Sequence, residues 1–180
     1  MLPSLEKEFT RLEQQLDHLL SLVKPLSNQQ QNFKPDPGTW SILQVFRHMM
    51  QSEGQINKYL RKKIQGVETT PKAGILSALR SAVLNAAMRL PLRYRVPDAI
   101  KVDLEERYEY EILATDWRAI RKEIRNFLET IDEAVARKEL FRHPSVGRMT
   151  IEQGMTFMQV HLERHTHQVE RLMARQDFPR

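Results

Sequence analysis

Two histidines four residues apart are the first feature of this chain that could do chemistry. His161 and His165 lie in the run 149–173, MTIEQGMTFMQVHLERHTHQVERLM, in which apolar residues recur every three or four positions. That period predicts a helix, and a helix places positions i and i+4 on one face, about one turn apart. Imidazoles at this spacing can bind one metal ion, so the pair is a candidate metal site.

The pair interrupts the apolar stripe of its own helix. The core side of this predicted helix contains Ile151, Met155, Met158, Leu162, Val169 and Leu172. His161 and His165 fall within that stripe, so we expect both side chains to point into the protein. A buried neutral imidazole needs partners for its nitrogens, which a metal or hydrogen bonds in the core could supply. His167 lies near the opposite face and is left out of the pair.

An earlier predicted helix supplies a third candidate ligand. It begins at Trp40 and Ser41, because Ser41 is a favourable N-cap before a periodic run. Its inner side is marked by Ile42, Val45, Met49, Ile56 and Leu60. His48 lies at the edge of this stripe, and three imidazoles with open positions are a usual site for a catalytic divalent metal. Zinc, nickel and iron all accept such ligands.

Glu53 lies in register with the core stripe of the same helix, where a carboxylate needs a partner. One hypothesis places Glu53 at the metal site, as a catalytic base, as an acceptor for the other N–H of a ligand, or as a weak fourth ligand. The alternative is an ion pair with a buried arginine. The sequence leaves both open.

Composition limits the class of protein. The length of 180 residues predicts a single domain over 1–180, and the absence of cysteine excludes disulfides, thiolate ligands and a cysteine nucleophile. There is no run of eighteen apolar residues and no secretory h-region, so we expect a soluble, cytoplasmic protein without a membrane partner. The net charge is +5, but the basic residues are mixed with 23 acidic ones, which disfavours nucleic acid as a partner.

The rest of the chain predicts an all-α fold. Further long helices are predicted over Pro3–Lys24 and Glu109–Lys138, and the T-x-x-Q spacing of Thr150 and Gln153 predicts a capping box before the last helix. No strand is predicted. A shorter helix is indicated between residues 66 and 101 by Ile75, Leu76, Leu79, Val83 and Met88. The expected architecture is four long amphipathic helices with a helical insert between the second and third.

The insert ends in basic residues. Arg89, Arg93, Tyr94 and Arg95 could border a site for an anionic ligand or lie on the surface.

Several of these motifs together resemble a known family. The spacing W-S-x6-H-x4-E contains Trp40, Ser41, His48 and Glu53, and H-x3-H-x2-Q contains His161, His165 and Gln168. The connector HPSVGRMT is similar to the lead-in HP-x-x-G-x-[LM]-[TS]. In this order, over nearly the whole chain, the motifs resemble the DinB/YfiT-like metalloenzymes of the DinB superfamily.

The resemblance implies a four-helix bundle in which His48, His161 and His165 bind a divalent metal ion. It also implies a homodimer that acts on a small-molecule substrate, by transferring a low-molecular-weight thiol to an electrophile or by metal-assisted hydrolysis. The alternative is a non-catalytic bundle that binds a small molecule or a partner and keeps a structural or vestigial metal site.

Two other metal sites are excluded by spacing. The zincin motif H-E-x-x-H requires glutamate directly after the first histidine, where this chain has Leu162. A di-iron bundle requires inward glutamates and paired E-x-x-H motifs, which this sequence lacks.

Overall fold

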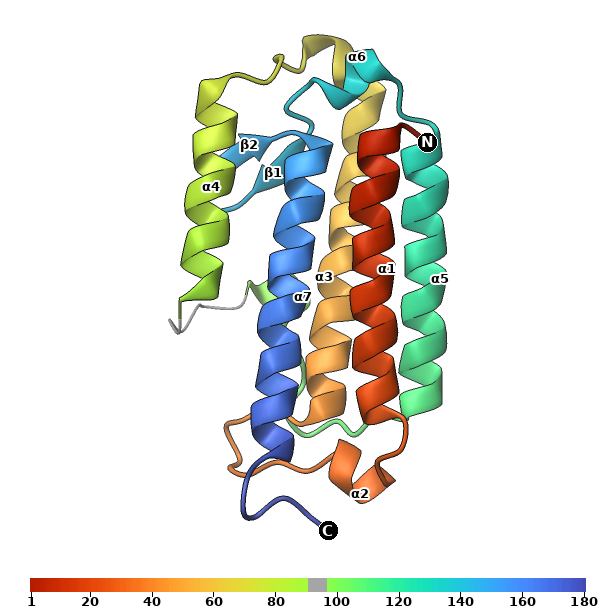
Figure 1. Cartoon of the computed structure of the whole chain (residues 1–180), viewed down its shortest axis with the longest axis vertical. Coiled ribbons are helices and arrows are strands. Elements are labelled where there is room, and N and C mark those ends of the chain that lie inside the picture. Colours follow the sequence, from red (N-terminus) through yellow and green to blue (C-terminus); the bar gives the residue numbers. More distant parts are fainter. Residues whose placement is uncertain (91–96) are drawn as a thin grey trace.

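The computed structural model describes residues 1–90 and 97–180, and long helices dominate this part of the chain (Figure 1). The long helices of the bundle are α1 (Pro3–Val23), α3 (Ile42–Lys63), α5 (Tyr110–Glu129) and α7 (Ile151–Met173). Both α1 and α3 contact α5 and α7, which places α1 diagonally opposite α3. The all-α, four-helix prediction is confirmed.

Shorter elements connect the bundle helices. They are α2 (Asn28–Gln31), the 3-10 helices at Ile64–Thr69 and Asp98–Ile100, α4 (Ile75–Arg89), α6 (Glu133–Ala136), β1 (Phe141–His143) and β2 (Gly147–Met149). The helix α4 is the predicted insert, and it packs on the outside of α7 and against β2 (Figure 1).

The two helices that carry the candidate ligands begin at capping boxes. Ser41 Oγ accepts a hydrogen bond from the backbone N–H of Gln44, and the Gln44 side chain accepts one from the Ser41 N–H. Thr150 and Gln153 form the same reciprocal pair at the start of α7. Both caps were predicted, and each fixes where its helix begins and therefore which residues face the core.

Apolar clusters fill most of the core, from one end of the bundle to the other. One buried cluster surrounds Leu5, Phe9 and Leu12 in the first half of α1. A second surrounds Leu16 and Leu19 in its second half. Because α1 contributes a continuous seam of leucines to both clusters, the scaffold around the histidines is rigidly packed.

The connector before α7 is a hairpin, which corrects the prediction that the chain has no strand. Residues Phe141 and Met149 pair at one end of the antiparallel ladder, and His143 and Gly147 pair at the other. Gly147 has φ +87°, a conformation that favours glycine, so it permits the tight turn. A Cβ at Gly154 would lie 2.7 Å from the Phe141 ring, so this glycine lets the hairpin pack directly on α7. Three-residue strands are too short to show an alternating pattern.

The third long helix is shorter than predicted. It ends at Glu129 rather than Lys138, and Thr130 Oγ1 donates to the backbone carbonyl of Phe127 at this end. The Asp132 side chain then accepts from the Val135 N–H and begins the separate helix α6. Apolar spacing continues across the break, and for that reason the sequence predicted one helix.

The insert helix forms as predicted, but most of its apolar stripe faces outward. Ile75, Leu76, Leu79 and Val83 are exposed, and Met88 is buried. Of the basic residues that follow, Arg89 is exposed, and its guanidinium donates to the Asn85 carbonyl. The proposed roles of Arg93, Tyr94 and Arg95 concern residues outside the described part of the chain.

Across the described residues, every helix is too short or too polar to cross a lipid bilayer.

Candidate metal centre

Three imidazoles from two helices converge inside the bundle. His48 comes from the second turn of α3, and His161 and His165 come from successive turns of α7. One potential ligand nitrogen from each lies within 4.8 Å of the other two. The Nε2 atoms of His161 and His165 are 3.1 Å apart, as the i, i+4 spacing requires for a shared face.

Two neighbouring oxygens determine which ring nitrogens carry protons. His48 Nδ1 lies 3.3 Å from the backbone carbonyl of Ile100, which can only accept a hydrogen bond. His165 Nδ1 lies 2.9 Å from the side-chain oxygen of Gln168. Each Nδ1 therefore carries the proton in these bonds, which leaves Nε2 of each ring with a lone pair. Partners of this kind usually orient the histidines of a metal site.

The surroundings keep all three rings neutral. Burial lowers the pKa of His48, in spite of the hydrogen bond to Ile100. Burial and the neighbouring His165 and His48 hold the pKa of His161 well below its usual range. Burial, with the effect of His48, lowers the pKa of His165 to about 3. At neutral pH the cluster therefore offers unprotonated nitrogens, the form that binds a metal.

The donor set fits a divalent ion. The Nε2 atoms of His161 and His165 are 3.1 Å apart, so they share either a proton or a cation. The ligand nitrogens of two imidazoles bound to one tetrahedral ion lie about 3.3 Å apart, which is close to this distance. His48 and His165 are buried, whereas His161 stays partly exposed. Three nitrogen ligands leave a fourth position for water or substrate, which is typical of catalytic sites rather than structural ones.

Aromatic side chains form walls beside the cluster. The Trp40 ring lies 4.8 Å from the His48 ring and 6.3 Å from the His165 ring, between ring centroids. Phe157 stacks on His161, with centroids 5.5 Å apart. His143 of the hairpin lies behind Phe157, at 4.8 Å between centroids. The walls lower the local polarity and restrict the positions from which water can approach.

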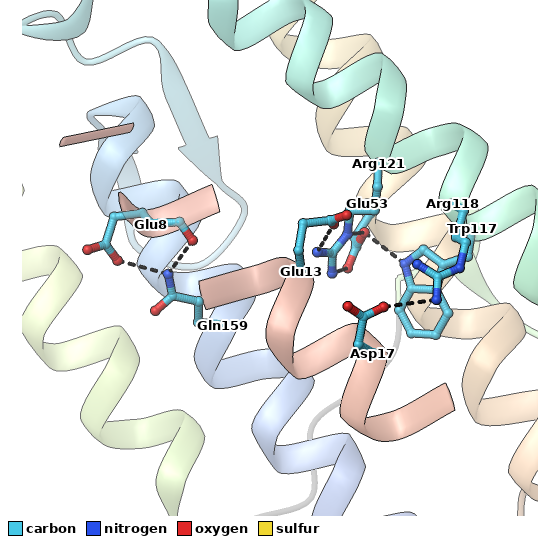
Figure 2. Close-up of polar contacts among 8 residues, drawn as sticks. All are labelled: Glu8, Glu13, Asp17, Glu53, Trp117, Arg118, Arg121 and Gln159. Atoms are coloured by element: carbon cyan, nitrogen blue, oxygen red, sulfur yellow. Dashed lines mark hydrogen bonds and ion pairs between the residues drawn. The ribbon is translucent and has the colours of Figure 1, made fainter. Parts of the chain in front are cut away.

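Glu53 is committed to a different cluster. Arg121 binds both of its carboxylate oxygens, with Nη2 2.7 Å from Oε1, and Trp117 Nε1 donates to Oε2 at 2.8 Å (Figure 2). Arg121 also donates to Glu13. Desolvation disfavours the charged guanidinium, yet Glu53 and Glu13 raise the pKa of Arg121 above its usual value. The structure thus describes the ion pair that the sequence left as the alternative.

Helix geometry explains why His48 and Glu53 serve different clusters. Five residues advance an α-helix by about 140°, so the two side chains leave α3 on different faces. His48 meets α7, and Glu53 meets α5. The sequence also held a signal for the arginine, because Arg121 lies four residues after Trp117 in the stripe of α5. Arg121 was not among the predicted site residues.

Comparisons with known proteins identify the family and the fold. The family model of the DinB superfamily matches residues 11–169. Among solved structures, YfiT from Bacillus subtilis is similar over 97% of this chain and 88% of its own, with 19% identity and a TM-score of 0.60. YfiT is described as a probable metal-dependent hydrolase with an unusual four-helix bundle topology. A search of curated proteins found no match.

The chain therefore belongs to the DinB superfamily. The chain has the fold of a YfiT-like helical bundle. Its histidine cluster could hold a metal ion.

Proposed function

We propose that the protein is a metal-dependent hydrolase of a small molecule. The observation that carries this proposal is the convergence of three neutral imidazole nitrogens within 4.8 Å of one another. His48, His161 and His165 hold the metal ion, whether zinc, nickel or iron. The similarity to YfiT supports the class of reaction, since that protein is described as a probable metal-dependent hydrolase.

Each residue of the site has a defined task. A divalent ion, when bound, lowers the pKa of a coordinated water to about 7 and polarises the bond to be cleaved. The Ile100 carbonyl and the Gln168 amide oxygen hold His48 and His165 in the tautomers that ligation requires. Trp40 and Phe157 limit the entry of other water and offer flat faces to a substrate.

The charge of the site favours certain substrates. Three neutral ligands leave the full positive charge of a divalent ion uncompensated, which favours reactions that develop negative charge, as ester, amide and phosphoester hydrolysis do. The chain has no cysteine, and Glu53 is occupied by Arg121, so we assign the nucleophile to solvent water. Glu53 then has a structural rather than a catalytic role.

Two finer points follow from the family resemblance. A low-molecular-weight thiol could replace water as the nucleophile, because an open metal position would lower the pKa of a thiol in the same way. We also include a homodimer in the proposal.

The test is metal analysis and turnover of the full chain. Purified protein should contain about one divalent ion per chain, identified by elemental analysis. It should hydrolyse at least one member of a panel of nitrophenyl esters, anilides and phosphodiesters. Chelation should abolish turnover, and adding the same metal should restore it. Parallel reactions with a thiol and a chromogenic electrophile would identify thiol transfer by its product.

The matched variants lie on one helix. His161→Ala should lose the metal and the activity, whereas His167→Ala should keep both, because His167 is exposed and pairs with Glu170. Full metal occupancy in His161→Ala would refute the site. Metal retention by the wild type without any turnover would favour the non-catalytic alternative.

A further inference from the structure

The outer face of α4 is the most apolar exposed surface that the structure describes. Ile75, Leu76, Leu79, Val83 and Leu90 are between 51% and 89% exposed, and Ile112 on α5 is the other large exposed hydrophobic among the described residues. These five side chains could contribute to the about 800 Å² per partner that a standard interface buries. The largest apolar patch on a protein surface is often functional.

The helix α4 differs from the bundle helices in carrying a row of apolar residues on its exposed side as well as polar residues on its buried side. Its buried residues include Ser77, Ser81 and Asn85, and small polar side chains of this kind let the helix lie close to α7 and the hairpin. Leu84 and Met88 are buried with them, whereas Ile75, Leu76, Leu79 and Val83 stay exposed among the described residues. An outward stripe of this type gains free energy only from a second apolar surface.

The same face is complementary to itself. Ala78, Ala82 and Ala86 recur every four residues and form a low row beside the higher row of Leu79 and Val83. Rows at spacing four are the ridges and grooves by which helices pack. In an antiparallel pair, the high row of one helix fits the low row of the other, and the same residues serve on both sides.

We propose that two copies of this chain associate through their α4 helices, packed antiparallel about a two-fold axis near Ala82. This inference rests on the homodimer in the proposed function and adds the surface that forms it; it does not depend on the metal chemistry. The absence of any acidic side chain on α4 means that the centre of the interface contains no charge pair.

Lys72 and Arg89 flank the face, so an anionic membrane is the main competing occupant. A bilayer would not require the regular alanine row, which an opposing helix uses. The two occupants also respond differently to an added positive charge, and the test uses this difference.

The experiment is the mass of the full chain in solution, measured by light scattering and sedimentation over a range of concentrations. Wild type should have twice the 21.3 kDa mass of one chain. Leu79→Glu and Val83→Lys should each weaken dimerisation by at least roughly 100-fold, because either charge would be buried. Ile112→Glu, at the other exposed hydrophobic, should stay dimeric. Circular dichroism checks that every variant is folded.

A second measurement tests the antiparallel arrangement. The chain has no cysteine, so Ala82→Cys introduces a single thiol that should form a covalent dimer with a short bismaleimide. Ile112→Cys should not.

The outcomes are distinct. A monomeric wild type, or a dimer that survives both α4 substitutions, overturns the inference, and failure of Ala82→Cys to cross-link overturns the antiparallel packing. Binding of a monomeric wild type to phosphatidylserine vesicles, lost in Leu79→Glu and kept in Val83→Lys, would show a membrane occupant instead. Metal content separates this inference from the proposed chemistry: Leu79→Glu should keep the metal, and His161→Ala should remain dimeric.

Discussion

Two buried polar clusters share helix α3, and they differ in whether opposite charges are paired within them. In the first, Glu53 receives hydrogen bonds from Arg121 and Trp117, and the charges cancel within the protein. In the second, one ring nitrogen from each of His48, His161 and His165 lies within 4.8 Å of the other two, and no opposite charge belongs to the described cluster. The first is a closed cluster and the second is an open one.

The difference indicates a division of labour. A satisfied buried ion pair fixes the register of α3 against α5 and has no capacity left for a ligand. Clustered neutral imidazoles carry no charge that another residue must cancel, and their ring nitrogens could bind a metal ion. The carboxylate closest in sequence to His48 on the core stripe therefore serves the scaffold, and the three imidazoles are the groups that could hold a metal ion.

The largest expected effect concerns the closed cluster. Glu53→Ala should lower the free energy of unfolding by about 3–5 kcal/mol, because the buried Arg121 charge and the Trp117 N–H lose their acceptor. Urea unfolding monitored by circular dichroism measures it. The double variant Glu53→Ala/Arg121→Met should recover much of the loss. A cost below about 1 kcal/mol in the single variant would mean that the ion pair is not the rigid element we describe.

The counterpart in the open cluster is His48→Ala. Removing a ligand should weaken metal binding by more than about 100-fold. This loss should exceed the one caused by removing a residue that only hydrogen-bonds to a ligand. The metal-free variant should lose much less stability than Glu53→Ala. Competition with a chelator gives the affinity. If folded Glu53→Ala protein lost as much metal affinity as His48→Ala, the two clusters would not act independently.

Acid should destabilise the open cluster. His165 has a pKa of about 3 when folded and an ordinary value of 6.5, so the unfolded chain binds more protons between these values. The contribution of neutral His165 to the free energy of unfolding is nearly complete above pH 6.5. It declines as the pH falls, and at pH 5 the free energy of unfolding is lower by about 2 kcal/mol. Unfolding of metal-free protein at pH 7 and pH 5 should show this loss, and His165→Gln should show a smaller one. Equal pH dependence in both proteins would refute the assignment.

The smallest expected effect concerns orientation. Gln168→Ala should weaken metal binding about tenfold, because His165 Nδ1 loses the acceptor that fixes its tautomer. Gln168→Glu keeps an acceptor oxygen and should retain most of the affinity. Titration calorimetry distinguishes them. Equal affinity in wild type and Gln168→Ala would show that the ring is held by packing alone.

Much of the fold followed from local patterns. The apolar periods predicted the long helices, and Ser41 and Thr150 predicted two of their beginnings, which the structure confirms. Where local signals competed, prediction failed. The spacing that carried the third helix past Glu129 gave no weight to the new cap at Asp132, and the hairpin strands were too short to show a period.

The candidate site also has features that local sequence predicts and features that depend on helix packing. The shared face of His161 and His165 follows from helix geometry, since four residues make about one turn. The position of His48 beside them depends on the packing of α3 against α7, which the family resemblance implied but the residues alone did not show. Glu53 was correctly placed in the core, but its partner is 68 positions away on α5, and a single stripe carries no information about the helix opposite.

The sequence by itself determined the long helices, two of their caps, the exclusion of thiolate ligands in a chain without cysteine, and the paired imidazoles on one helix face. The tertiary structure alone decided which polar groups satisfy one another and which remain available, and which side of α4 faces outward. The reason is physical: dihedral preferences and side-chain periodicity act within a few residues, whereas burial and hydrogen-bond satisfaction depend on how separate helices pack together.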